Sequence, residues 1–253
     1  MGQVMAYEFD TNSSLSPLLD IARRHYKELR PVQLFGFNRT IGTTFESIFN
    51  NGGGIYPFLS SASQLTIVSD SASDTTDLYI EGLDSEYVPI SETVTLDGTT
   101  PVTTVKSFFR VNRAQMLTAT NVGNVSIKVS TDTLGYLEAG SGVHQAIVYT
   151  VPADSQLFIV NVSFASGTVN PNKYLTGKAS LGFSSGLNQT FWQSTWAVGF
   201  LQFDVKMPFI VPEKTDFTFE VKSSSGENEI DCYMGAFLES DGWIVDQINR
   251  VWL

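Results

Sequence analysis

The sequence has few of the side chains on which most enzyme and metal sites depend. It contains one cysteine, Cys232, and two histidines, His25 and His144, in 253 residues. A single cysteine excludes an internal disulfide and any zinc site that needs several thiolates. With so little nucleophilic and acid–base chemistry available, we expect no enzymatic activity, no catalytic or metal-binding residues and no cofactor.

Charge is also scarce, and it is mainly of one sign. Charged residues make up 16% of the chain, and 15 basic against 26 acidic residues leave a net charge of −11. Nucleic-acid binding needs a basic surface, so this balance argues against it. No apolar run approaches the roughly 18 residues of a membrane-spanning helix. The first ten residues contain acids and no basic stretch, so we also expect no signal peptide.

The chain is rich in apolar residues, which make up 42% of it and include 18 phenylalanines. From residue 32 onward these residues alternate with polar ones, as in half-buried antiparallel strands. In one stretch, for example, Phe158, Val160, Val162 and Phe164 are predicted to share the buried face. The clearest such stripes are residues 125–129, 158–164, 201–209, 217–221 and 230–234. The pattern predicts a mainly β protein, an antiparallel β-sandwich of jelly-roll type.

Turn residues divide these strands. Asp97-Gly98 lies between residues 92–96 and 99–105 and predicts a two-residue hairpin. Pro101 and Pro208 predict edge strands or strand ends, because proline donates no ladder hydrogen bond. The glycine-rich segment Tyr136–His144 is the best candidate for a boundary. We therefore expect β lobes over 32–140 and 141–253, or one continuous sandwich.

The N-terminal arm, residues 1–31, differs from the rest because it carries a helix pattern. Ser16 can cap the helix, Pro17 suits its first turn and Pro31 should end it. An isolated helix of about fourteen residues is marginal in water. Its apolar face should therefore pack on the protein's own body or dock on a neighbouring copy or a shell. The candidate assembly contacts are Leu18, Arg23, Arg24, Tyr26, Lys27 and Leu29.

Three local patterns could indicate chemistry, and each has a simpler interpretation. Residues 182–186 match the G-x-S-x-G nucleophile elbow, but no helix pattern and no histidine follow, which favours a hairpin turn. Asp70, Asp74 and Asp77 could supply oxygen ligands for calcium, yet such residues also favour ordinary turns. Trp192 and Trp196 share a face and could bind sugar, but burial in the core is the favoured interpretation.

Three stretches carry a resemblance to known proteins. The first runs from Gly36-Phe37-Asn38 to Tyr56-Pro57. The second runs from Ile80-Glu81-Gly82 to Phe109-Arg110-Val111-Asn112-Arg113. The third begins Val211-Pro212-Glu213-Lys214-Thr215-Asp216 and ends at Gly226. In this order they resemble a family of virion structural proteins of tailed bacteriophages, mostly marine phages.

The resemblance implies a non-enzymatic structural component of a tailed-phage virion, made late in infection in the host cytoplasm. A capsid-surface decoration or stabilising protein is the first interpretation, and a tail, baseplate or fibre-adaptor component is the alternative. A carbohydrate-binding or glycan-degrading β-sandwich protein is a second alternative. The expected partners are further copies of the chain, with a trimer as the first guess, and the major capsid protein or other virion proteins. We expect neither nucleic acid nor membrane as a partner.

Overall fold

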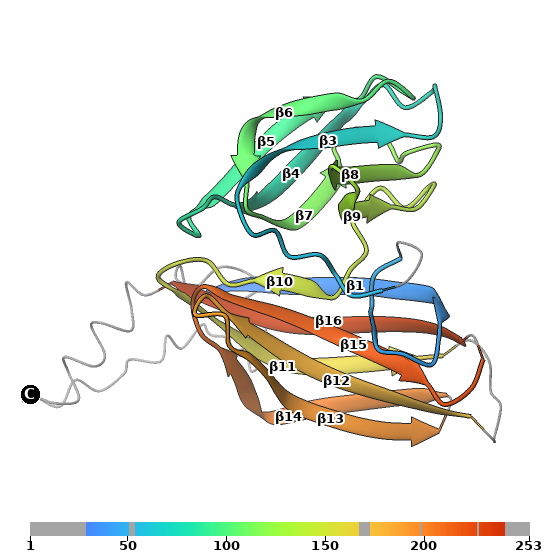
Figure 1. Ribbon diagram of the computed structural model, residues 1–253, viewed down its shortest axis with the longest axis vertical. Coiled ribbons are helices and arrows are strands. Elements are labelled where there is room, and N and C mark those ends of the chain that lie inside the picture. The colour runs from blue at the N-terminus through green and yellow to red at the C-terminus, as the bar shows by residue number, and fades with distance from the viewer. Residues whose placement is uncertain (1–28, 51–53, 167–172, 198, 227, 241–253) are drawn as a thin grey trace, which may run out of the picture.

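The computed structural model describes residues 29–50, 54–166, 173–197, 199–226 and 228–240 (Figure 1). All regular structure in these ranges is β, arranged in four antiparallel sheets, so the predicted mainly β class is confirmed. No helix among the described residues is long and apolar enough to span a membrane. In chain order the strands are β1 (Leu29–Ile41), β2 (Glu46–Ser47), β3 (Ser63–Ser69), β4 (Asp77–Leu83), β5 (Pro89–Thr95), β6 (Val102–Phe108), β7 (Arg110–Met116), β8 (Val125–Val129), β9 (Asp132–Leu137), β10 (Val148–Thr150), β11 (Ser155–Ala165), β12 (Tyr174–Phe183), β13 (Asn188–Ala197), β14 (Phe200–Val211), β15 (Thr215–Ser223) and β16 (Asn228–Ser240).

The first and last strands belong to the same sandwich, which we call the terminal sandwich. One of its sheets has the order β1-β16-β11-β14, and the other has the order β10-β15-β12-β13 with β2 added beside β15. Strands β3 to β9 form two further sheets, β6-β3-β8-β9 and β5-β4-β7. We call this second unit the inserted sandwich, because its strands lie between β2 and β10 in the chain. Figure 1 shows it beside the edge strands β1 and β10 of the terminal sandwich.

This arrangement differs from the chain order of the two predicted lobes. β1 pairs with β16 from Leu29↔Glu239 to Ile41↔Asn228, so the start of the predicted first lobe shares a sheet with the end of the second. Close packing also holds β1 against the segment that precedes β10. A Cβ at Gly36 would lie only 2.8 Å from the backbone of Ala146, just before β10. The division into lobes at residue 140 stays a prediction.

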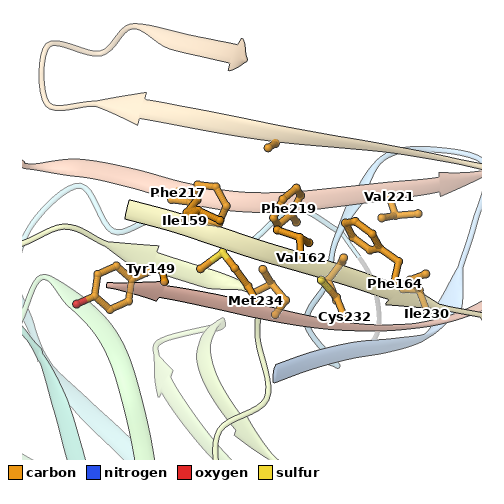
Figure 2. Packing of buried hydrophobic residues seen from close by; sticks show 14 of the residues in the cluster. Tyr149, Ile159, Val162, Phe164, Phe217, Phe219, Val221, Ile230, Cys232 and Met234 are labelled. Atoms are coloured by element: carbon orange, nitrogen blue, oxygen red, sulfur yellow. The ribbon is translucent and has the colours of Figure 1, made fainter. Parts of the chain in front are cut away.

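A group of contacting aromatic rings lies among the aliphatic side chains in the core of the terminal sandwich. Side chains from β11, β15 and β16 meet between its two sheets in Figure 2. Phe164 is fully buried, with ring centroids of Trp196, Phe219 and Trp192 at 5.1, 5.4 and 6.1 Å from its own. The prediction that the two tryptophans belong to the core is therefore confirmed, with Trp196 buried and Trp192 partly buried.

The inserted sandwich has a separate core that is mainly aliphatic. Its residues lie between Phe49 and Val148, a single continuous part of the chain. Phe108 is its largest fully buried side chain. The fully buried aliphatic residues of this core include Leu65, Ile67, Leu78, Ile80, Val125, Ile127, Leu134 and Leu137.

The predicted stripe of β11 is wrong at its start because the strand contains a β-bulge. The register shifts between Ile159 and Asn161 against both neighbouring strands. An extra residue reverses the alternation of faces. Leu157 and Ile159 are therefore buried together with Val162 and Phe164, whereas Phe158 lies on the other face.

The predicted hairpin at Asp97-Gly98 is also wrong in its pairing. Gly98 has a φ of 56°, and a turn is present. However, β5 pairs with β4 and β6 pairs with β3, so this turn carries the chain from one sheet to the other. The proline predictions are confirmed: Pro101 directly precedes β6, and Pro208 lies in β14, at the edge of its sheet.

The predicted end of the N-terminal helix needs correction as well. Leu29, Arg30 and Pro31 are the first residues of β1 and pair with β16, so no helix extends to residue 30. Proline is tolerated there because β1 is an edge strand. Residues 1–28, which contain the rest of the predicted helix, lie outside the described residues.

Candidate functional site

A dense polar cluster lies where the two sandwiches meet. Arg110 opens β7 of the inserted sandwich, and Asp216 lies on β15 of the terminal sandwich. The Arg110 Nε and Nη2 donate to the two carboxylate oxygens of Asp216, at 2.7 and 2.8 Å. The two side chains are only 7% and 13% exposed. A bidentate pair of this kind is both strong and specific in its geometry.

Other polar atoms of Arg110 and Asp216 make further hydrogen bonds. Arg110 Nη1 donates to the backbone carbonyls of Leu59 and Phe109, each at 2.8 Å, and the guanidinium lies 3.8 Å from the centroid of the Phe109 ring. The Thr150 hydroxyl donates to Asp216 at 2.6 Å. Buried ion pairs are tolerated only when such bonds compensate their desolvation. The cluster therefore binds the two sandwiches to each other.

A second contact reinforces the junction between β7 and β10. The amide nitrogen of Asn112 donates to the carbonyl of Thr150 at 2.8 Å, and the Thr150 N–H donates to the Asn112 side-chain oxygen at 2.9 Å. The Asn112 side chain thus makes the pair of hydrogen bonds with Thr150 that the backbone of a neighbouring strand residue would make. Nearby, the Ala153 N–H donates to the Tyr87 carbonyl at 2.9 Å. We call the set Arg110, Asn112, Thr150 and Asp216 the junction cluster.

His144 lies in the segment that leads from β9 to β10, close to this junction. Its Nδ1 accepts the N–H of Tyr136 at 3.2 Å, and its ring packs edge-on against Phe49. Its Nε2 has no hydrogen-bond partner among the described residues. Burial lowers the pKa of His144 to about 4, so the ring is neutral at pH 7. A neutral histidine held in this way is a packing residue of the connection.

The G-x-S-x-G residues form a hairpin turn, as the sequence favoured. They connect β12 directly to β13, and Gly186 has a φ of 84°. A nucleophile elbow needs a helix after the serine, and here a strand follows Ser184. Cys232 points into the core between the sheets, where burial raises its pKa well above the usual value (Figure 2). His25 lies outside the described residues.

The three aspartates of residues 70–77 each have protein partners. Asp74 is buried and accepts hydrogen bonds from the Ser69 hydroxyl and from the N–H groups of Val122 and Gly123. Burial alone would raise the pKa of Asp74, but these bonds together hold it below its usual value. Asp70 accepts two bonds from Asn124, and Asp77 accepts the Thr95 hydroxyl. Among the described residues, no group of three or more potential ligands is placed to hold a metal ion.

Of the six candidate assembly contacts, only Leu29 is among the described residues. Leu18, Arg23, Arg24, Tyr26 and Lys27 lie outside the described residues, so their role stays a prediction. Leu29 lies at the start of β1, opposite Glu239.

Sequence reasoning missed the junction cluster, because its charged members are 106 residues apart. The only available signal was indirect. Arg110 and Asn112 fall in the second stretch that resembles phage virion proteins, and Asp216 falls in the third.

Comparison with known proteins adds only weak structural similarities to this description. No family model matches the sequence, and no curated protein matches it. Among solved structures, the VP2 subviral particle of infectious bursal disease virus matches with a TM-score of 0.26 and 12% identity, over 85% of this chain and 72% of that chain. The Gx strain of the same virus gives 0.26 and 11% over the same shares, and its T=1 particles give 0.24 and 12% over 85% and 70%. TM-scores of this size do not establish a common fold.

Proposed function

We propose that the chain is a non-enzymatic structural component of a tailed-phage virion, and that it decorates or stabilises the surface of the capsid. One observation carries the proposal. The three stretches that resemble phage virion proteins, distant from one another in sequence, meet at the junction between the two sandwiches.

Each stretch supplies a part of that junction. The first contains Gly36, whose lack of a side chain lets β1 approach the segment before β10. The second contains Gly82, where a Cβ would collide with the Arg110 carbonyl, and also Arg110 and Asn112 themselves. The third contributes Asp216. The residues in these three stretches thus fix the position of one β-sandwich relative to the other. This is a structural role, and it needs no catalytic residues.

The remaining properties fit a protein packed among other proteins. Its low charge and net acidity suit contact with other virion proteins better than contact with nucleic acid. We propose that it assembles with further copies of itself, with a trimer as the first expectation, and with the major capsid protein. Its location would then be the virion.

Quantitative mass spectrometry of purified particles tests the proposal. A capsid decoration protein should be present in a copy number comparable with that of the major capsid protein. Immunogold labelling should place it on heads. A copy number close to that of tail or baseplate proteins, with label on tails, would favour the tail alternative. Absence from particles would contradict both.

The third interpretation is tested on the purified protein. Incubation with bacterial surface polysaccharides should release no products, and glycan arrays should give no specific binding. Turnover of any glycan would overturn the non-enzymatic assignment.

A further inference from the structure

The outward face of the sheet β1-β16-β11-β14 carries a row of apolar residues that crosses all four strands. Strand register aligns Pro31 with Phe237, Phe237 with Phe158, and Phe158 with Ile210. Ile210 is 57% exposed and Pro31 is also exposed, while the two phenylalanines are partly exposed. We call Pro31, Phe158, Ile210 and Phe237 the apolar row.

The row lies on the outside of the sandwich and contributes nothing to its core. On β16, Ile230, Cys232, Met234 and Ala236 belong to the core cluster, so the alternate residue Phe237 faces outward. The bulge in β11 has the same consequence, because it turns Phe158 outward while Leu157 and Ile159 remain buried. A row of large apolar side chains on one sheet face is typical of a surface that another element covers.

We propose that residues 16–28 of the same chain pack as an amphipathic helix across the apolar row. The argument starts from where this segment joins the body. Leu29 opens β1, two residues before Pro31, and β1 is the edge strand of this sheet. The segment therefore arrives beside the first member of the row, at the edge from which it can cross the other three strands.

The lengths agree. Four neighbouring strands span three spacings, or about 14 Å. A helix that runs back from Leu29 covers about 15 Å in ten residues. Leu19 then lies over Ile210 on β14, and Tyr26 lies near Phe237 on β16. The apolar residues of the segment follow at helical spacing, so a single face of the helix can cover the row.

The positions of the charged residues also agree with this placement of the helix. The basic residues of the segment lie between its apolar positions, at Arg23, Arg24 and Lys27. With the apolar face on the sheet, they face solvent. The body of this acidic protein then presents a short basic strip on an otherwise acidic surface. This inference does not depend on the proposed virion role, because it concerns the folding of the chain on itself.

Site-directed cross-linking in the full chain tests this placement. Leu19→Cys combined with Ile210→Cys should form an intramolecular link with a short bismaleimide. The matched control, Leu19→Cys with Gln193→Cys, places the second thiol at an exposed position on β13, in the opposite sheet. The proposal expects a yield roughly tenfold or more above this control, because contact raises the effective concentration of one thiol near the other. The unmodified chain, whose Cys232 is buried, controls for reaction of that thiol.

The outcomes are distinct. Equal yields for the two pairs would overturn the proposal, and so would links that appear only between chains on denaturing gels, which would mean docking on a neighbouring copy.

Two truncations test the choice of segment. Removal of residues 1–28 should increase binding of a hydrophobic dye to the folded body, whereas removal of 241–253 should not. The reverse result would assign the row to the C-terminal segment and contradict the proposal. Circular dichroism of each variant verifies folding.

Discussion

The two sandwiches are built from the same kind of strand but stabilised in different ways. The core of the terminal sandwich contains a network of aromatic rings in which Phe164, Phe217 and Phe219 contact one another or the tryptophans. The inserted sandwich has a mainly aliphatic core with a smaller ring group of Phe49, Tyr56 and Phe58. Its loops are tied by hydrogen bonds that Asp74 accepts and that Asn121 both donates and accepts.

The difference follows from how each unit is closed. The terminal sandwich combines strands from both ends of the chain, and large rings can fill the space between its long sheets. The inserted sandwich is continuous in sequence, its strands have five to seven residues, and its loops carry buried hydrogen-bonded side chains. Ring packing tolerates changes of pH, whereas hydrogen bonds to carboxylates do not. The two units should therefore respond differently to mutation and to acid.

The largest effect should follow from deleting an aromatic ring in the terminal sandwich. Phe164→Ala should lower the free energy of unfolding by about 4 kcal/mol, because it leaves a cavity and removes ring contacts as well. Leu78→Ala in the inserted sandwich should cost less, about 3 kcal/mol. Urea unfolding of both variants measures the difference, with exposed Val105→Ala as a neutral control. A larger loss for Leu78→Ala would contradict the ranking.

The next effect concerns the junction that joins the two units. Asp216→Asn should cost about 3 kcal/mol, because it leaves the Arg110 guanidinium buried without its counter-charge. In calorimetry we expect the unmodified chain to unfold in one transition and Asp216→Asn to unfold in two, one for each sandwich.

The control for the junction is an exposed ion pair. Arg113 and Glu81 lie 3.8 Å apart, and both are largely exposed, so Glu81→Gln should change stability by less than about 0.5 kcal/mol. The double variant Arg110→Met with Asp216→Asn should be less destabilised than the sum of the single variants. Strict additivity would show that the pair is not coupled.

His144 should make stability depend on pH. Its folded pKa of about 4 lies below the unfolded value of about 6.5, so the unfolded chain binds more protons between these values. Its contribution is complete above pH 6.5 and is lost as the pH falls toward 4, by at most about 3 kcal/mol. His144→Gln should remove this part of the slope in urea unfolding between pH 7 and 4.5. An unchanged slope would show that the histidine is not buried in a neutral form.

The smallest effect should come from the hairpin serine. Ser184 is exposed in the turn between β12 and β13, so Ser184→Ala should change the free energy of unfolding by less than about 0.5 kcal/mol. Thermal unfolding provides the measurement. A loss of some defined hydrolytic activity in this variant would instead show that the turn has a chemical role.

Strands were predictable from sequence where alternation was uninterrupted, as in Phe217, Phe219 and Val221 of β15, all of which are buried. The bulge in β11 was not, because one extra residue changes the buried face without changing the composition. Neither was the pairing around Asp97-Gly98, since turn residues indicate a reversal but not which sheet the chain joins next. The junction cluster was beyond reach for a related reason: nothing local in Arg110 indicates a partner on β15.

The entry and exit of the inserted sandwich lie side by side. Phe49 forms a bridge with Ala146, and the Ile147 N–H donates to the Ile48 carbonyl at 3.0 Å. A unit whose two ends meet can be gained, lost or exchanged by recombination without rethreading the framework that holds it. The inserted sandwich meets this geometric condition, because its removal between Phe49 and Ala146 would leave the strand order of the terminal sandwich unchanged.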